Sequence, residues 1–184
     1  MKLGIVVGST RPGRVGIKLA EWLLDVASQR DGIDAALIDL ARVNLPMYDE
    51  AAHPRFRKYQ NAYTQSFSAL IAGIDAFVIV TPEYNHNPPS ALLNALTFLN
   101  SEWAYKPIAF MSYGGISGGL RAVQTLKLTM LALRTVPIFD GVVVPLVAQR
   151  IVDGRFDPTE MQVEAAGTVL TDLAKWSEAL TQLR

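Results

Sequence analysis

Five short apolar runs, each followed by a helical pattern, are the feature of this sequence that most restricts its fold. A nearly continuous run such as Leu3–Val7 is typical of a strand that is buried on both faces. After it, Val15, Leu19 and Leu23 recur every four residues, as on a helix with one buried stripe. The predicted strands are Leu3–Val7, Ala35–Leu40, Ala76–Val80, Ile108–Met111 and Ile138–Val144.

These β/α units predict an α/β fold with a five-stranded parallel sheet and helices on both faces. Right-handed crossovers leave two common strand orders for such a sheet, and with five strands we expect the flavodoxin-like order 2-1-3-4-5. In that order a ligand binds at the carboxyl ends of the strands, where the first and third strands diverge, so the loops after strands one, three and four are the candidates. No repeat or linker interrupts the pattern, and we expect residues 1–184 to form a single domain.

Three further segments have helical periodicity. They are Phe56–Ile74, Ala91–Asn100 and Leu120–Leu133. In the first, we expect one inner stripe formed by Tyr59, Tyr63, Phe67, Leu70 and Ile74.

Composition excludes several classes of function. The 17 basic and 17 acidic residues balance, which argues against a non-specific nucleic-acid surface. The chain has no cysteine and only two histidines, so thiol chemistry and an imidazole-rich metal site are excluded. We expect no transmembrane helix and no signal peptide, and a cytoplasmic location. Any redox chemistry therefore requires a bound cofactor.

The first candidate loop is GSTRPGRVG, residues 8–16. Its glycine spacing resembles a nucleotidase P-loop, but Arg14 and Val15 stand where that motif needs lysine and a hydroxyl. A dinucleotide G-x-G-x-x-G also fails, because Arg11 occupies its first glycine position. The loop therefore predicts phosphate binding without phosphate cleavage, and the alternative is an ordinary turn with exposed arginines. The predicted phosphate ligands are Ser9, Thr10, Arg11, Val15 and Gly16.

The second loop, TPEYNHNPPS (residues 81–90), contains three prolines that restrict its backbone. A rigid polar loop beside the crevice suits recognition of a planar heterocycle, and Tyr84 offers a stacking face. We expect Asn87 to cap the following helix, with Pro88 in its first turn, and His86 to be a surface residue. The alternative is a stiff connection without a binding role.

The third loop, SYGGISGG (residues 112–119), contains four glycines. Glycine permits positive φ angles and a close approach of the backbone to a ligand. The alternative is a flexible surface loop.

Together, GSTRPGRVG, TPEYNHNPPSALLNAL and SYGGISGG resemble the NADPH-dependent FMN reductase family, which includes quinone, chromate and azo-dye reductases. The family pattern is GS-x-R, TPEYN-x-x-x-P and S-x-G, and all three motifs occur here in order.

The resemblance implies that FMN binds at the switch point and that NADPH or NADH is the cosubstrate. By position, the first loop would hold the FMN phosphate. Pro82, Glu83, Tyr84 and Asn85 would line the isoalloxazine, chiefly through backbone groups. The other edge of the flavin would be closed by Ser112, Gly114 and Gly115.

Family members are homodimers or homotetramers, with the helix after TPEYN at the dimer interface. The segment 91–99 is apolar all round, which also predicts a subunit interface. Relatives often carry Lys and Asp where this chain has Leu93 and Thr97, so we expect a more hydrophobic interface here.

The predicted reaction is hydride transfer from the nicotinamide to flavin N5 and then to a small acceptor: a quinone, an azo compound, chromate or free flavin. Because the flavin carries the chemistry, we expect no essential catalytic acid or base and no metal. Arg14 and Arg121 are the candidate partners of a 2′-phosphate, although spacing assigns neither. One alternative is an electron carrier of the same fold, which the net charge of zero disfavours. Another is a flavin-free regulatory domain.

Overall fold

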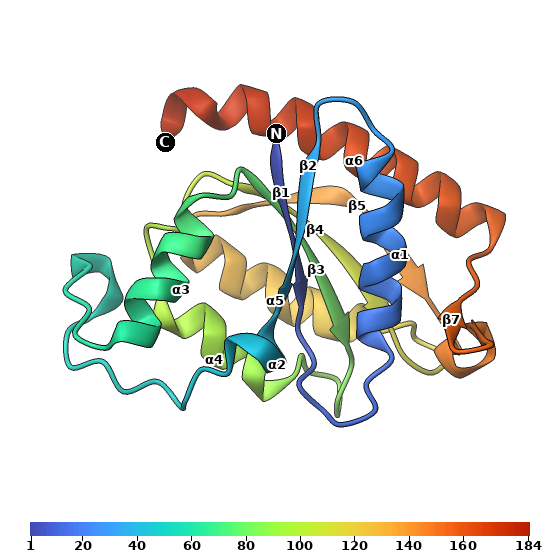
Figure 1. Ribbon diagram of the computed structural model, residues 1–184, viewed down its shortest axis with the longest axis horizontal. Coiled ribbons are helices and arrows are strands. Elements are labelled where there is room, and N and C mark those ends of the chain that lie inside the picture. The colour runs from blue at the N-terminus through green and yellow to red at the C-terminus, as the bar shows by residue number, and fades with distance from the viewer.

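In the computed structural model, which describes residues 1–184, five parallel strands form a sheet in the order β2-β1-β3-β4-β5 (Figure 1). This order confirms the flavodoxin-like fold predicted from the apolar runs. Every residue of β3 and β4 is buried, as expected for strands covered on both faces. The strands are β1 (Lys2–Val7), β2 (Asp34–Asp39), β3 (Ala76–Pro82), β4 (Pro107–Tyr113) and β5 (Val136–Val144).

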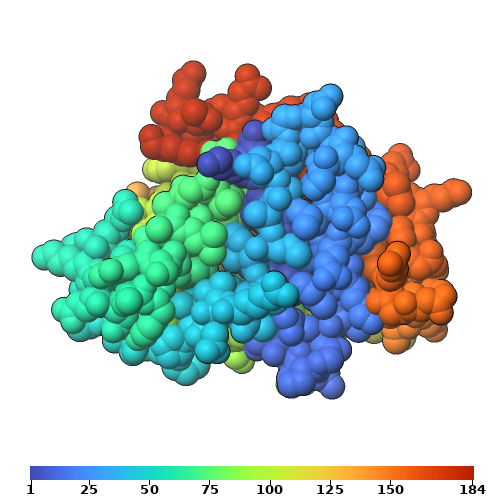
Figure 2. Space-filling view, in the orientation of Figure 1, coloured from blue at the N-terminus to red at the C-terminus, as the bar shows by residue number.

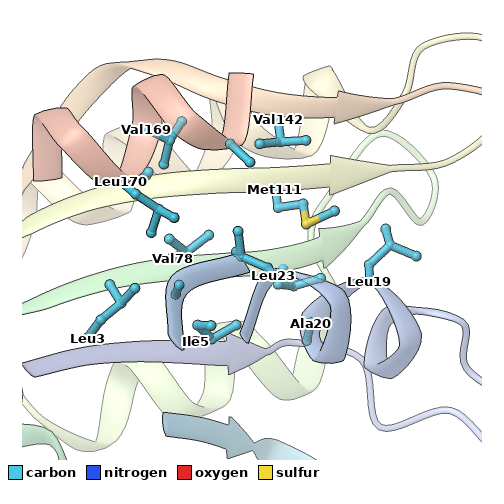
Figure 3. Close-up of a cluster of buried hydrophobic side chains, with 14 of the residues drawn as sticks. Leu3, Ile5, Leu19, Ala20, Leu23, Val78, Met111, Val142, Val169 and Leu170 are labelled. Carbon is cyan, nitrogen blue, oxygen red and sulfur yellow. The ribbon is translucent and has the colours of Figure 1, made fainter. Parts of the chain in front are cut away.

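Helices cover both faces of the sheet. One core lies between the sheet and the pair α1 (Gly16–Ser28) and α6 (Glu160–Leu180), and Figure 3 shows Leu23 and Leu170 in it beside strand residues such as Val78. The second core lies under three helices on the opposite face. These are α3 (Ala62–Ala72), α4 (Ser90–Phe98) and α5 (Leu120–Ala132).

The helix predicted over 56–74 begins later than its periodicity indicates. A 3₁₀ turn, η1 (Pro54–Phe56), comes first, and Arg57 then adopts a positive φ of 52°. The buried carboxylate of Glu50 accepts hydrogen bonds from the backbone amides of residues 60 and 61, at 2.9 and 3.1 Å. This long-range acceptor holds in an irregular conformation a stretch that the sequence pattern alone would make helical.

The predicted inner stripe of that segment is correct except at one position. Phe67 and Ile74 are buried, and Tyr59 and Tyr63 are partly buried. Leu70 is 42% exposed, so its assignment to the inner side was wrong.

Four further short elements were not predicted. They are the helix α2 (Leu40–Val43), the 3₁₀ turn η2 (Val147–Arg150) and the antiparallel hairpin of β6 (Ile151–Val152) and β7 (Arg155–Phe156). In the hairpin, Asp153 and Gly154 both have positive φ, a turn for which Asp-Gly is a strong signal. Phe156 then packs edge-on against Trp22 of α1, with ring centroids 5.2 Å apart.

After this hairpin, α6 begins with a capping box between Thr159 and Gln162. The helix is followed by the 3₁₀ turn η3 (Thr181–Leu183). None of the helices is both long enough and apolar enough to span a bilayer.

Helix α4 is largely covered within one chain. Leu92, Leu96 and Phe98 are buried, and Leu93 is only partly exposed. The Thr97 hydroxyl donates to the Leu93 carbonyl of its own helix at 2.9 Å. Most of the apolar surface that suggested a subunit interface here therefore belongs to the internal core.

The loops after β1, β3 and β4 lie at the carboxyl end of the sheet, opposite the end that carries the chain's N-terminus (Figure 1). In the space-filling view, the blue segment that follows β1 projects at the lower edge of the molecule (Figure 2). The fold therefore brings all three candidate loops to one edge, as predicted.

Candidate functional site

The first loop connects β1 to α1 and ends in unpaired backbone donors. Thr10, Arg11 and Val15 donate to no backbone carbonyl. Val15 is the N-cap of α1 and provides no side-chain cap. Within the first turn, the Lys18 amide donates to the Val15 carbonyl at 3.0 Å, and the Gly16 amide faces the Tyr113 hydroxyl. A helix N-terminus with free N–H groups is an anion-binding site, and this one has 13 residues of helix behind it.

The two arginines of this loop have different environments. Arg11 is exposed, and its guanidinium makes no ion pair within the chain. Arg14 instead pairs with Asp39 at the end of β2, with Nη2 2.6 Å from the carboxylate oxygen. Its Nε is buried without an acceptor. Arg11 is thus the cation available to a ligand, whereas Arg14 anchors the loop to the sheet.

The second loop contains a tight two-residue turn. Tyr84 and Asn87 exchange backbone hydrogen bonds of 2.8 and 2.9 Å, and Asn85 and His86 between them have φ values of 52° and 66°. Positive φ at both central residues is the type I′ geometry, which asparagine tolerates well. The ring of Tyr84 is partly exposed, and its hydroxyl lies 2.8 Å from that of Ser9 in the first loop.

The prediction that Asn87 caps α4 was wrong. The N-cap is Pro89, with no side-chain cap, and the helix begins at Ser90. Asn87 is used to close the turn instead, because its side-chain amide donates to the carbonyl of Asn85 at 3.1 Å. His86 is exposed, as predicted.

Glu83 joins the second loop to the third. Its carboxylate accepts from the Ser117 hydroxyl at 3.1 Å and from the Arg121 backbone amide at 3.0 Å, and it pairs with the Arg121 guanidinium at 3.1 Å. Burial alone would raise the pKa of Glu83, but the bonds from Arg121 and Ser117 outweigh it and lower that pKa. Glu83 is therefore a structural carboxylate, and Arg121 is committed to it rather than free for a 2′-phosphate.

In the third loop, the last two glycines are the ones that a larger residue could least replace. Gly118 and Gly119 have φ values of 59° and 84°, and a Cβ on Gly119 would lie 2.8 Å from the Tyr113 carbonyl oxygen. By contrast, a Cβ on Gly115 would meet nothing within 4 Å, which leaves open space above this part of the loop. Gly114 is intermediate, with its nearest neighbour at 3.4 Å.

Ser112 lies apart from the other predicted site residues. It is buried, and it borders a separate pocket of about 260 Å³ between α5 and β5, together with Phe139 and Val143. The structure therefore joins the first loop to Tyr84, and Glu83 to the third loop, while the Ser112 side chain faces another cavity.

Comparison with known proteins identifies the relationship. The family model for NADPH-dependent FMN reductase matches residues 1–149. The chain belongs to the NADPH-dependent FMN reductase family. It is therefore an oxidoreductase of the type that uses NAD(P)H and FMN.

Individual members support this assignment. The chain is 34% identical over 160 residues to the NAD(P)H-dependent FMN reductase C4B3.06c of Schizosaccharomyces pombe, covering 85% of this chain and 79% of that protein. It is 28% identical over 177 residues to a quinone reductase of Escherichia coli, covering 91% and 88%. The solved structure of the flavoenzyme NAD(P)H:(acceptor) oxidoreductase FerB from Paracoccus denitrificans has the same fold, with a TM-score of 0.75, 22% identity and 97% of each chain covered.

A residue of this FMN reductase that sequence reasoning missed is Tyr113, the last residue of β4. It is 5% exposed, and a Cβ placed on Gly16 would lie 2.5 Å from its hydroxyl oxygen. Gly16 is thus required to admit the phenol ring to the N-terminus of α1. The motif SYGG contains this tyrosine, but its contact with the first loop depends on the packing of β4 against α1.

A pocket of about 460 Å³ beside the first loop was also not anticipated. It lies between α2, the segment that follows α2 and the start of α4. Its lining residues are Thr10, Leu40, Ala41, Asn44, Leu45, Met47, Ser90, Ala91 and Asn94. No group of three or more His, Asp or Glu side chains is placed to bind a metal ion.

Proposed function

We propose that this chain passes hydride from NADPH or NADH through bound FMN to a small acceptor such as a quinone, an azo compound, chromate or free flavin. Bound FMN supplies the redox chemistry, and the protein supplies binding and orientation. The observation that carries the proposal is the set of free backbone amides at Thr10, Arg11 and Val15, in the loop before α1 that also carries the unpaired guanidinium of Arg11. This set of donors suits a phosphate monoester.

Each loop has a role in this proposal. The FMN phosphate is held by Ser9, Thr10, Arg11, Val15 and Gly16. The isoalloxazine lies against the second loop, where the backbone of Pro82, Glu83 and Asn85 and the ring of Tyr84 line it. The backbone at Ser112, Gly114 and Gly115 closes the other edge, and the open space above Gly115 supports that assignment. No side chain is assigned as a catalytic acid or base.

The proposal includes a single FMN-binding domain over residues 1–184 and a cytoplasmic location. It also includes self-association, as dimer or tetramer, through a surface different from the one expected. The most exposed large apolar side chains of α5 and β5 are Leu128, Leu131 and Phe139, at 72%, 64% and 95%. By contrast, α4 presents mainly Leu93. We therefore place the contact between copies on α5 and β5.

The activity is tested by anaerobic stopped-flow mixing of the flavin-loaded protein with NADPH, and then with each acceptor. Rapid bleaching of the flavin by NADPH, followed by reoxidation on adding a quinone, is the expected result. A flavin that NADPH does not reduce would leave an electron carrier as the better description.

The phosphate site is tested by Arg11→Ala. We expect the Kd for FMN to rise by about tenfold or more, because a charge-assisted hydrogen bond to phosphate is lost. At saturating FMN, the rate of hydride transfer should change less. Arg155→Ala is the control, since Arg155 is exposed on the β6–β7 hairpin and makes no ion pair. Unchanged FMN affinity in Arg11→Ala would show that the phosphate has been assigned to the wrong residues.

A further inference from the structure

The side chain of Tyr113 places a hydroxyl beside the N-terminus of α1. Tyr113 is only 5% exposed, and its ring packs in the core between the sheet and α1. Its oxygen faces the Ser9 hydroxyl and the Gly16 amide, which act as donors to it, so the phenol proton is left without an acceptor in the chain. Phenylalanine would fill the same space, so packing of the ring alone does not explain why tyrosine occurs here.

The hydroxyl is placed where an anion would need a donor. It lies against Gly16, the first residue of α1, at the N-terminal end of that helix. Ser9, which is fully buried, holds its own hydroxyl 2.8 Å from Tyr84. Three hydroxyls, from β4 and from the first and second loops, therefore gather at the N-terminus of one helix.

The hydroxyl is also in the protonation state that donation requires. Burial, together with the neighbouring Tyr84 phenol, raises the pKa of Tyr113, while Ser9, Gly16 and Arg14 oppose the rise. The group is neutral at physiological pH and offers an O–H. Arg11 is exposed to solvent, whereas Tyr113 is buried.

We propose that the Tyr113 hydroxyl donates a hydrogen bond to the phosphate of FMN, on the core side of the site that Arg11 closes from solvent. This inference rests on the proposed function and adds a ligand from the third motif to a site otherwise built from the first loop. The phosphate is then bound both by the loop that follows β1 and by the last residue of β4, and these contacts favour FMN over riboflavin.

The experiment compares FMN with riboflavin, which lacks the phosphate, in Tyr113→Phe. The variant keeps the ring against Gly16 and removes only the oxygen. Kd values come from the quenching of flavin fluorescence by flavin-free protein. We expect the Kd for FMN to rise by about tenfold, because a hydrogen bond to a charged group is lost, and the Kd for riboflavin to stay unchanged. Tyr105→Phe is the matched control, since Tyr105 precedes β4 at the opposite end of the same strand.

A second measurement uses inorganic phosphate as the probe. Phosphate should raise the Tm of the flavin-free wild type and of Tyr105→Phe, and should raise that of Tyr113→Phe much less. An unchanged ratio of FMN to riboflavin affinity in Tyr113→Phe, or an equal loss for both flavins, would overturn the inference while leaving the proposed function intact. A wild-type protein that binds neither flavin would refute the proposed function, and this inference with it.

Discussion

The contact between Gly16 and Tyr113 makes a quantitative prediction about the substitution Gly16→Ala. A methyl group at this position would lie 2.5 Å from the Tyr113 oxygen and 3.1 Å from two carbons of its ring. A real Cβ atom essentially never lies within 3.0 Å of another non-bonded heavy atom, so something must move. The ring is packed in a core of fully buried side chains and has little room to move.

The magnitude follows from two opposing effects. Inserting a methyl group into a well-packed site typically costs about 1–3 kcal/mol. Alanine is favoured over glycine inside a helix by about 1 kcal/mol, and by less at the first helical position. We therefore expect Gly16→Ala to lower the free energy of unfolding by about 1–2 kcal/mol. For a chain of this size, the corresponding fall in Tm is about 2–8 °C.

The assay is urea unfolding of the flavin-free protein, so that weaker FMN binding does not contribute to the difference. The same substitution in a Tyr113→Phe background should cost less, because the closest of the three contacts is removed while the two ring carbons remain. A coupling of about 0.5–1 kcal/mol in this double-mutant cycle is the expected result. If Gly16→Ala is as stable as the wild type, or if the two changes are additive, the close approach does not explain this glycine.

Three further predictions concern groups away from that contact. Glu83→Gln should speed FMN dissociation severalfold while changing the free energy of unfolding by less than about 1 kcal/mol, because the paired arginine is exposed. The recovery of flavin fluorescence after dilution measures the dissociation rate, and Asp172→Asn is the control. Burial lowers the pKa of Lys106 from its ordinary 10.5 to about 8. Between these two pH values the unfolded chain binds more protons than the folded chain. The stability of the wild type should therefore rise with pH in this interval, relative to that of Lys106→Met. Urea unfolding of both proteins at pH 7.5 and 10 tests this, and parallel pH profiles would contradict it. Finally, Phe139→Asp should dissociate the oligomer in sedimentation velocity while Leu93→Asp does not; the opposite outcome would restore α4 as the interface.

Much of the fold could be predicted because its strands are buried on both faces and leave an apolar signal that does not depend on distant residues. The strand order followed from general rules of handedness, and the three loops could be placed at one edge before any contact was known. The start of α3 was missed because Glu50, not local periodicity, determines the backbone at residues 60 and 61. Asn87 was misassigned because an asparagine before a helix serves equally well in a turn.

The predicted site was incomplete for a related reason. Loop glycines and hydroxyls are visible as motifs, whereas Tyr113 acquires its position from the packing of a strand against a helix far away in the sequence. The interface predicted at α4 stays a prediction, because an apolar pattern records only that a side chain is covered. It does not record whether the cover is the same chain or another copy.

The ion pair between Arg14 and Asp39 has a consequence for how the cofactor comes and goes. Together with the bonds that Glu83 makes, it fixes the rim of the site through contacts that do not involve a ligand. The conformational entropy of ordering these loops is then lost during folding rather than at flavin binding. A rim preorganised in this way lets the flavin leave and return to an unchanged site. Flavin binding then carries little ordering cost, so more of the contact energy contributes to affinity.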